Sequence, residues 1–312
     1  MATVLITGGT GLIGKALSAM LLRKNYEIII LTRTIPAAES QQPGISYAQW
    51  NVEAGEIDKV AIAKADYIIH LAGAGVAEKK WTDKRKTEII ESRTKSGALL
   101  VKALSETENH IKAVISSSAV GWYGPDTPAS LQKGFNEDWT SADDFLGKTC
   151  KLWEAAIQPV ETPGKRLVIL RTGIVLSNDG GALAEFKKPL KFGIASILGS
   201  GDQITSWIHI DDICRMYLHA IENNISGIYN AVAPHPVTNK QLTLTLAKAT
   251  KGSAFVSMHV PAFVLKIMLG EMSIEVLKSA NVSVSKFQQT GFQFLYPTID
   301  AALGNLAKAY IE

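Results

Sequence analysis

The chain has 312 residues, enough for one large domain or for a main domain with a smaller partner. Nearly half of the residues are apolar and a fifth are charged, which is typical of a soluble globular protein. The net charge is only +3 and the lysines are scattered, so the composition gives no reason to expect a nucleic-acid partner.

Short apolar runs alternate with amphipathic stretches in the first half of the chain. Apolar runs that are nearly continuous indicate parallel strands buried on both faces, and we expect them at residues 3–7, 27–32, 65–71, 112–117 and 166–170. Helical spacing predicts helices at residues 13–24 and around residues 84–106. This alternation predicts an α/β fold with a doubly wound parallel sheet.

The sequence pattern changes after about residue 175, where glycine-rich loops alternate with short helices and strands. Residues 207–218 are expected to begin extended and to become helical at Asp211 or Asp212, because either aspartate can cap a helix. A helix at 239–250, a strand at 255–259 and two or three further helices complete the expected elements.

Two domains follow from this change of pattern. Residues 1–175, with a return at residues 207–231, are expected to form a Rossmann domain. The smaller C-terminal domain, of α+β type, would contain residues 176–206 and 232–312, and the site for a substrate would lie between the two.

A glycine-rich turn follows the first expected strand and precedes the first expected helix. Its sequence is Thr7-Gly8-Gly9-Thr10-Gly11-Leu12-Ile13-Gly14. The three glycines at 8, 11 and 14 allow a sharp turn, a close approach of the backbone to a pyrophosphate, and close packing of the helix on the sheet. The phosphates would bind the free N–H groups at the start of the helix. The turn also resembles part of a P-loop, but Ala16 stands where Mg²⁺ needs a hydroxyl, so we exclude a nucleoside triphosphatase.

The residue at the end of the second strand decides which dinucleotide binds. A carboxylate at this place would hold the ribose 2′-hydroxyl of NAD and would repel a 2′-phosphate. This chain has Arg33 instead, and no acidic residue occurs until Glu39. Arginine can pair with a phosphate and stack on adenine, so we predict NADP(H) as the cofactor.

Other site classes lack their signatures. The two cysteines, Cys150 and Cys214, suit a reducing compartment, and neither they nor the histidines have metal-ligand spacing, so no metal is expected. A Gly-x-Ser-x-Gly elbow of hydrolases is absent. The N-terminus runs directly into a strand, and the apolar run at residues 260–269 is too short to span a bilayer. We therefore expect a cytoplasmic protein without a membrane partner.

The chain resembles the atypical extended short-chain dehydrogenase/reductases known as epimerase family proteins, which end in a C-terminal domain of unknown function. Some relatives carry a cell-division-inhibitor label. The resemblance runs from end to end, and it rests on the glycine-rich turn and on the segments HLAGAGVA (70–77), WTDKRKTEIIESR (81–93), RTGIVLSNDGGAL (171–183), GSGDQITSWIHIDD (199–212), NAVAPHPVTNKQ (230–241), VPAFVLKIMLGE (260–271) and TGFQFLYP (290–297).

The resemblance implies a set of contacts with the cofactor. The pyrophosphate would be held by Gly8, Thr10, Gly11, Leu12 and Ile13. Thr32 and Arg33 would hold the 2′-phosphate, and Leu71, Ala72 and Gly73 would lie beside the nicotinamide ribose. Further contacts would come from Glu88, Arg93 and Val175.

The catalytic residues of this fold are only partly present. Active members use a Tyr-x-x-x-Lys pair with a Ser or Thr, and the lysine lowers the pKa of the tyrosine. In typical members a glutamate follows the lysine by four residues. If Glu154 is that glutamate, the lysine position holds Cys150 and the tyrosine position holds Leu146. Lys148 and Lys151 miss the position by two residues and one residue, and one residue turns a helical side chain by about 100°.

Two hypotheses about function remain open. In the first, the protein is an NADP(H)-dependent oxidoreductase or epimerase-like enzyme whose proton donor has moved, with Tyr123 and Ser118 as candidates and His209 as a weaker one. In the second, it is a non-catalytic NADP(H)-binding regulator related to cell division. The sequence identifies neither the substrate nor the oligomeric state. A cluster at the cleft would suit a nucleotide-sugar or another anionic small molecule, and its expected members are Trp81, Trp122, Tyr123, Trp207, Lys187 and Lys188.

Overall fold

The computed structural model describes residues 1–162 and 164–308, and its main feature is an eight-stranded sheet. The strand order is β12-β7-β6-β5-β1-β2-β3-β4, and all neighbours are parallel except the short β4, which is antiparallel to β3. The bounds are β1 (Thr3–Thr7), β2 (Glu27–Thr32), β3 (Ile45–Asn51), β4 (Glu56–Ile57), β5 (Tyr67–His70), β6 (Ala113–Ala119), β7 (Arg166–Thr172) and β12 (Gly227–Ala231). The doubly wound parallel sheet predicted from the sequence is confirmed.

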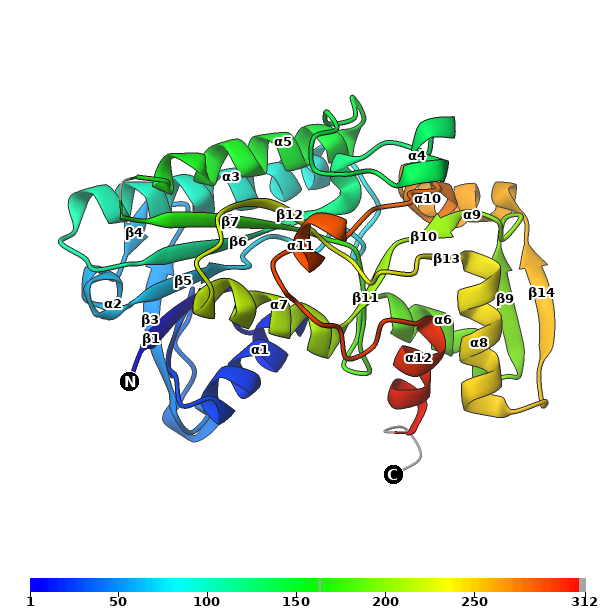
Figure 1. The fold of residues 1–312 in the computed structure, drawn as a ribbon, viewed down its shortest axis with the longest axis horizontal. Helices are drawn as coiled ribbons and strands as arrows, with labels where there is room; N and C mark the ends of the chain where they lie inside the picture. The colour runs from blue at the N-terminus through cyan, green and yellow to red at the C-terminus, as the bar shows by residue number, and fades with distance from the viewer. Residues whose placement is uncertain (163, 309–312) are drawn as a thin grey trace.

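Helices cover both faces of this sheet. The helices α3 (Asp83–Glu106) and α5 (Phe145–Ile157) pack together on one face, and α1 (Leu12–Arg23) and α7 (Ile210–Glu222) pack together on the other (Figure 1). Each face has its own apolar core, because the central strands are buried on both sides. The short helices α2 (Lys59–Lys64) and α4 (Pro128–Lys133) belong to connections of the same sheet.

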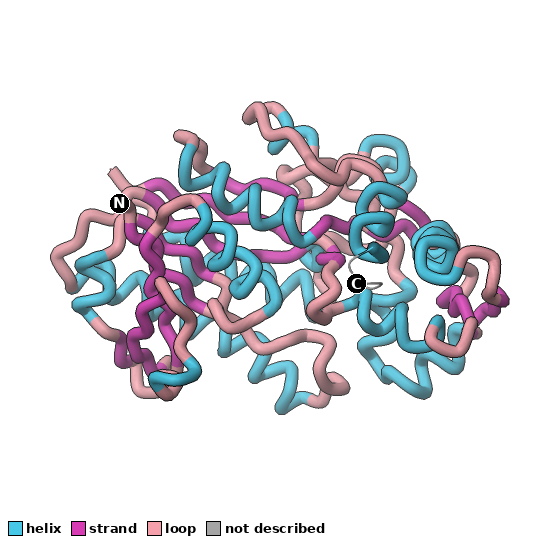
Figure 2. Tube along the Cα trace, turned by 90° about the horizontal axis from the view of Figure 1, so that it is seen from below, coloured by secondary structure: helices cyan, strands magenta, loops and turns pink. Residues whose placement is uncertain are grey.

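A smaller unit lies at the other end of the molecule (Figure 2). It contains the strands β9 (Ile194–Leu198), β10 (Ile204–Thr205), β13 (Val237–Thr238) and β14 (Val256–Val260) and the helices α6 (Ala182–Leu190), α8 (Asn239–Lys251), α9 (Ala262–Leu269), α10 (Ser273–Leu277) and α12 (Ile299–Lys308). A third apolar cluster, which includes Trp207, Leu242 and Leu303, forms its core. The mixed helix and strand content agrees with the predicted α+β type.

Two parts of the fold differ from the sequence-based expectation. The strand β3 was not expected, because its burial alternates along its length and it lacks the continuous apolar run of the central strands. The described residues after β14 also hold four α-helices rather than two or three, because α10 and the short α11 (Ser285–Gln288) are separate turns.

The start of α7 also differs from the expectation. His209, at the end of β11 (Trp207–His209), caps this helix: its Nδ1 accepts a hydrogen bond of 3.0 Å from the Asp211 backbone N–H. Asp212 cannot act as the cap because its buried carboxylate accepts the backbone N–H groups of Leu295 and Tyr296, at 2.8 and 2.9 Å. This aspartate therefore fastens the C-terminal segment to α7.

Candidate functional site

The glycine-rich turn forms an open anion site at the start of α1. Gly11 precedes the helix, no side chain caps it, and no acidic residue lies in its first turn, so the first N–H groups remain available to phosphates. Gly8 has φ of +68°, and a Cβ atom there would lie 2.8 Å from the Leu71 carbonyl carbon. A Cβ atom on Gly14 would lie 2.4 Å from the Gly8 oxygen. A left-handed turn at Gly8 and close packing of the helix at Gly14 are therefore present.

A buried Thr7–His70 pair aligns the ends of β1 and β5 beside this turn. The Thr7 hydroxyl oxygen accepts the backbone N–H groups of Leu71 and Ala72, each at 3.2 Å, and lies 2.8 Å from His70 Nδ1. With both N–H groups directed at the oxygen, the hydroxyl proton points to Nδ1 and the imidazole is neutral. Burial, with a smaller contribution from Arg93, lowers the pKa of His70 to about 4.

The end of β2 exposes a cation. The Thr32 hydroxyl donates to the Thr34 carbonyl at 2.9 Å, and the Gln49 amide donates to the Arg33 carbonyl at 3.3 Å. These two bonds fix the backbone of the turn, while the Arg33 side chain is exposed. The arrangement can therefore hold an anion next to an adenine ribose bound at the glycine turn.

The loop after β5 is held by side chains of α3. Arg93 Nη1 donates to the carbonyl of Ala74 at 3.0 Å, and the Ser92 hydroxyl accepts the Ala74 N–H, also at 3.0 Å. The Arg85 guanidinium donates to the Gly75 carbonyl and forms ion pairs with Glu78 and Glu88. Three consecutive carbonyl groups are fixed in this way, since the Trp81 indole also donates to Val76. The loop therefore presents Leu71, Ala72 and Gly73 in a defined shape.

Arg93 lies at the centre of this region and is 8 % exposed. Its guanidinium carbon is 4.7 Å from the centre of the Trp153 ring, and a Cβ atom on Gly73 would approach it to 3.0 Å. Within the described residues, neither its Nε nor its Nη2 forms a hydrogen bond. Glu88 differs, because its exposed carboxylate pairs with Arg85 at 2.8 Å, which lowers the pKa of Glu88.

Val175 and Leu12 are brought together on the other side of the glycine turn. Val175 belongs to the short strand β8 (Ile174–Leu176), which is parallel to β11 and half-buried at this residue. A Cβ atom on Gly181 would lie 3.1 Å from Leu12 Cδ2 and 3.8 Å from the Val175 oxygen. The loop that follows β8 therefore packs on the first turn of α1.

The positions of the missing tyrosine and lysine face the end of β6. A Cβ atom on Gly121, in the turn after β6, would lie 3.2 Å from Leu146 Cβ and 3.7 Å from Cys150 Sγ. Burial raises the pKa of Cys150 to about 12, so this thiol stays protonated. Lys148 and Lys151 are both exposed, on another face of α5. The helix therefore presents an apolar residue and a neutral thiol where the reaction of typical members uses a tyrosine and a lysine.

Ser118 and Tyr123, the predicted catalytic residues, belong to one buried polar network. Ser118 donates to Glu154 at 2.7 Å, and the Glu154 carboxylate receives Arg171 through two bonds of 2.8 and 2.9 Å. Arg171 donates to the Tyr123 hydroxyl at 3.1 Å, and Tyr123 donates to Asn230 at 2.8 Å. All five side chains are buried. The sequence did not indicate Glu154 or Arg171 as partners of these hydroxyls.

The Tyr123 hydroxyl is poorly placed to exchange a proton with a ligand in this conformation. The residue is 1 % exposed, and its ring stacks on Phe135 with centroids 5.0 Å apart. Burial raises the pKa of Tyr123 to about 12, although Arg171 acts in the opposite direction. These observations favour a packing role. The assignment of Ser118 and Tyr123 as catalytic residues stays a prediction.

The expected aromatic cluster at the cleft does not form as one group. Trp207 is buried in the core of the smaller unit and donates to the His235 carbonyl at 3.1 Å. Trp122 covers Arg171, with 3.6 Å between the guanidinium carbon and the ring centre. Trp81 contacts the start of α5, through an edge-on contact of 4.9 Å with Phe145. His209, with its cap bond and Asn305 as partner, has a structural role.

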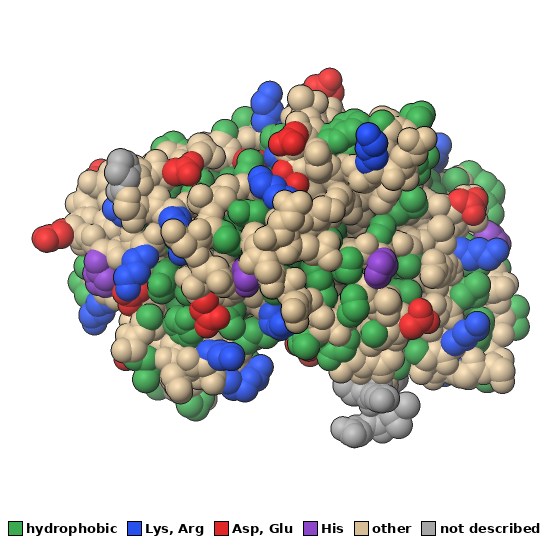
Figure 3. Space-filling model, viewed as in Figure 1, with side chains coloured by type: hydrophobic (Ala, Val, Ile, Leu, Met, Phe, Trp, Pro, Cys, Tyr) green, Lys and Arg blue, Asp and Glu red, His purple; other side chains and the backbone are tan. Residues whose placement is uncertain are grey.

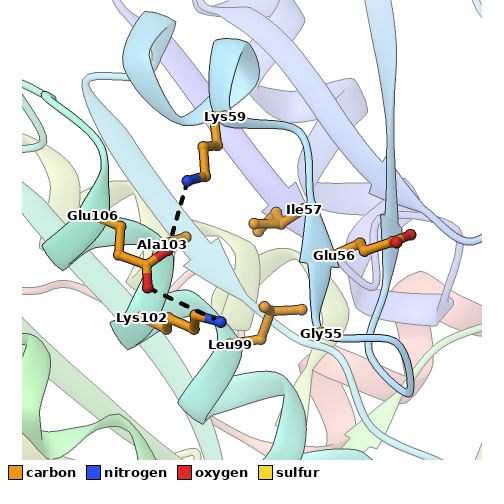
Figure 4. Close-up of a pocket in the computed structure, with 8 residues that line it drawn as sticks. All are labelled: Gly55, Glu56, Ile57, Lys59, Leu99, Lys102, Ala103 and Glu106. Carbon is orange, nitrogen blue, oxygen red and sulfur yellow. Dashed lines mark ion pairs between the residues drawn. The ribbon is translucent and has the colours of Figure 1, made fainter.

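Two surface cavities lie away from the glycine turn. One, of about 270 Å³, lies between β4 and the second half of α3, and Lys59 and Lys102 pair there with Glu106 (Figure 4). The other, of about 370 Å³, lies between Trp139 and Lys286. Figure 3 shows cations and anions interspersed over one face of the molecule. In the described part of the chain, no group of three His, Cys, Asp or Glu residues could hold a metal ion. No helix there is long and apolar enough to cross a membrane.

Known proteins resemble this chain over its whole length. The pattern of the NAD dependent epimerase/dehydratase family matches residues 4–148, and a domain of unknown function, DUF1731, matches residues 260–306. Epimerase family protein YfhF of Bacillus subtilis is 36 % identical over 305 residues, which are 97 % of each chain. Epimerase family protein SSP1921 of Staphylococcus saprophyticus is 37 % identical over 308 residues, 98 % of this chain and 99 % of its own.

Two solved structures extend this comparison. Human epimerase family protein SDR39U1 (isoform 2), solved with NADPH, is 30 % identical with a TM-score of 0.85, and the match covers 98 % of this chain and 99 % of that chain. A nucleoside-diphosphate sugar epimerase from Corynebacterium glutamicum is 32 % identical with a TM-score of 0.75, over 98 % of this chain and 58 % of that chain. The chain therefore belongs to the epimerase family proteins, extended short-chain dehydrogenase/reductases in which an NAD-dependent epimerase/dehydratase region is followed by DUF1731.

Proposed function

We propose that this chain is an NADP(H)-dependent oxidoreductase or epimerase-like protein that acts on a small molecule such as a nucleotide-sugar or another anionic compound. The observation that carries the proposal is the uncapped start of α1 next to the exposed Arg33, with no carboxylate at the end of β2. The human relative solved with NADPH supports the choice of cofactor.

The residues around the glycine turn fit such a cofactor. In this proposal Gly8, Thr10, Gly11, Leu12 and Ile13 hold the pyrophosphate, because the backbone N–H groups of α1 are free and side chains are excluded. Thr32 and Arg33 hold the adenosine 2′-phosphate. Leu71, Ala72 and Gly73, whose backbone Thr7 and α3 fix, lie beside the nicotinamide ribose with Val175 on the opposite side. When bound, NADPH supplies a hydride.

In this proposal Arg93 performs the role of the lysine that α5 lacks. In typical members this lysine binds the ribose and favours the ionised form of a neighbouring group. Arg93 is a buried cation against Gly73, with donors left free, and its charge acts on Cys150 at the former lysine position. In this proposal Glu88, which pairs with Arg85, also contacts the cofactor near its nicotinamide ribose.

A non-catalytic NADP(H)-binding regulator is the second candidate. The observation in its favour is the pair Leu146 and Cys150, which leaves these two positions of α5 without a group that can donate a proton near neutral pH. If the protein is an enzyme, Ser118 and Tyr123 position the end of β6 through the buried network, and the proton comes from elsewhere.

A fluorescence titration with NADPH and NADH tests the proposed cofactor. We expect wild type to bind NADPH at least about tenfold more tightly than NADH, because a charge-assisted arginine–phosphate pair contributes about 1.5–3 kcal/mol. Arg33→Ala should lose this preference, whereas Arg23→Ala, an exposed arginine at the far end of α1, should retain it. Equal affinity of wild type for both cofactors would contradict the proposal.

A further inference from the structure

Lys86 of α3 forms an ion pair with Glu271 of the C-terminal segment, close to the start of α5. Lys86 Nζ lies 2.7 Å from Glu271 Oε1 and 2.5 Å from Oε2, so a single carboxylate takes both of the hydrogen bonds of this lysine. Glu271 belongs to a 3-10 turn (Gly270–Met272) between α9 and α10, so the pair joins the two domains. The Lys86 ammonium also lies 5.5 Å from the centre of the Phe145 ring.

This contact lies one residue before the position of the missing tyrosine on α5. Phe145 directly precedes Leu146, which occupies the tyrosine position on α5. Lys86 and Arg93 lie seven residues apart on α3, which is about two helical turns, so both face α5. Arg93 lies against the lysine position, and Lys86 lies against the residue next to the tyrosine position. Two cations of α3 thus lie beside the stretch of α5 that carries the two changed positions.

A second lysine–glutamate pair nearby has a different role. Lys278 donates to Glu275 at 2.9 Å and to the Tyr123 carbonyl at 3.2 Å, and it lies 3.9 Å from Asp144 Oδ2. Its side chain is only 6 % exposed. Partners therefore surround this ammonium group, and it anchors the C-terminal segment to the turn after β6.

Lys86 is open to a ligand by comparison. Its side chain is 24 % exposed, and that of Glu271 is 42 % exposed. A partly solvated ion pair of this kind contributes little to stability, so one N–H group can turn to a bound oxygen at little cost. An ammonium group has three donors, and the carboxylate occupies two of them.

We propose that Lys86, held by Glu271, binds the reacting oxygen of a carbonyl or hydroxyl substrate and is its proton donor. This inference rests on the proposed function. In the reductive direction a bound NADPH would supply the hydride for the carbonyl carbon and would be released as NADP⁺. The C=O π electrons move to the oxygen, which takes a proton from the Lys86 ammonium. The neutral amine then regains a proton from water. Glu271 acts through Lys86 and is a positioning residue.

The test combines cofactor titration with reduction of diacetyl, a small vicinal diketone, followed by the loss of NADPH absorbance. Lys86→Met should lower kcat/KM for diacetyl by at least about 100-fold, the usual contribution of a general acid. Lys86→Arg keeps a hydrogen-bond donor, so its KM should stay within about threefold while kcat falls, because guanidinium does not release a proton. Lys84→Met, an exposed lysine on the same helix, is the control and should behave as wild type.

A second readout does not depend on turnover. Reductive methylation followed by peptide mass spectrometry should label Lys84 and Lys86 in the free protein, and NADP⁺ with diacetyl should protect Lys86 alone. Unchanged turnover by Lys86→Met, unchanged labelling of Lys86, or NADPH binding without any diacetyl reduction by wild type would each overturn this inference and leave cofactor binding intact. Failure of wild type to bind NADPH would instead overturn the proposed function.

Discussion

Glu154 and Arg171 form the most deeply buried ion pair that the structure describes, and they hold Ser118 and Tyr123 at the end of β6. Replacing one partner leaves the other charge buried without compensation, so we expect Glu154→Gln to lower the free energy of unfolding by about 3–5 kcal/mol. Chemical denaturation measures this change. Glu185→Gln, which breaks an exposed pair with Lys188, is the matched control and should change stability by less than about 0.5 kcal/mol.

His70 makes stability depend on pH. Its pKa is lowered from 6.5 to about 4 by burial, so the unfolded chain takes up a proton at a higher pH than the folded protein does. Its contribution is complete above pH 6.5 and is lost as the pH falls towards 4. The difference between the two pKa values corresponds to a loss of about 3 kcal/mol in the free energy of unfolding. Denaturation curves between these limits should show a smaller loss for His70→Gln than for wild type. Equal pH dependence of the two proteins would contradict a neutral buried imidazole.

At the scale of elements, the glycine turn gives the sharpest prediction. Gly8→Ala would place a methyl group 2.8 Å from the Leu71 carbonyl carbon and would move the backbone that receives the pyrophosphate. We expect its NADPH affinity to fall by at least about tenfold, one lost phosphate contact or more. Gly55 has the same φ of +68° with nothing within 4 Å, so Gly55→Ala should cost some stability and leave the affinity unchanged. Titration of both variants separates strain from a cofactor contact.

The sequence predicted best those elements whose environment is uniform. The strands β1, β2, β5, β6 and β7 are buried on both faces, so their apolar runs located them directly. The sequence did not predict the strand β3, because its burial alternates near the sheet edge and gives no continuous apolar run. The cap of α7 was predicted wrongly, because aspartate often caps helices but Asp212 instead binds the backbone N–H groups of Leu295 and Tyr296.

In the candidate site, too, the sequence predicted the local features and not the contacts between distant residues. Local rules predicted the glycine turn and the lack of an acid at the end of β2. The pairings of Ser118 with Glu154, of Arg93 with the loop after β5, and of Lys86 with Glu271 join residues separated by 19 to 185 positions. Such contacts depend on how α3, α5 and the C-terminal segment pack, and no local pattern encodes them.

At the scale of the whole molecule, a buried carboxylate fastens the C-terminal segment to α7. Asp212 holds the N–H groups of Leu295 and Tyr296. Asp212→Asn keeps the shape but replaces one acceptor with a donor, so both amides should exchange with deuterium at least about tenfold faster, because a buried hydrogen bond to a charged group contributes about 1.5–3 kcal/mol. Hydrogen exchange at these residues measures the change. Amides in β1 should keep their protection, and equal loosening there would indicate global destabilisation instead.

The central claim is that the chain distinguishes its cofactor by the charge at the end of β2. Calorimetric titration of wild type and Arg33→Asp with NADP⁺ and NAD⁺ tests this claim most directly. We predict that wild type prefers NADP⁺ and that the variant prefers NAD⁺, because a carboxylate repels the 2′-phosphate and accepts the ribose 2′-hydroxyl. An unchanged order of affinities in Arg33→Asp would contradict the account and would place recognition of the adenosine elsewhere.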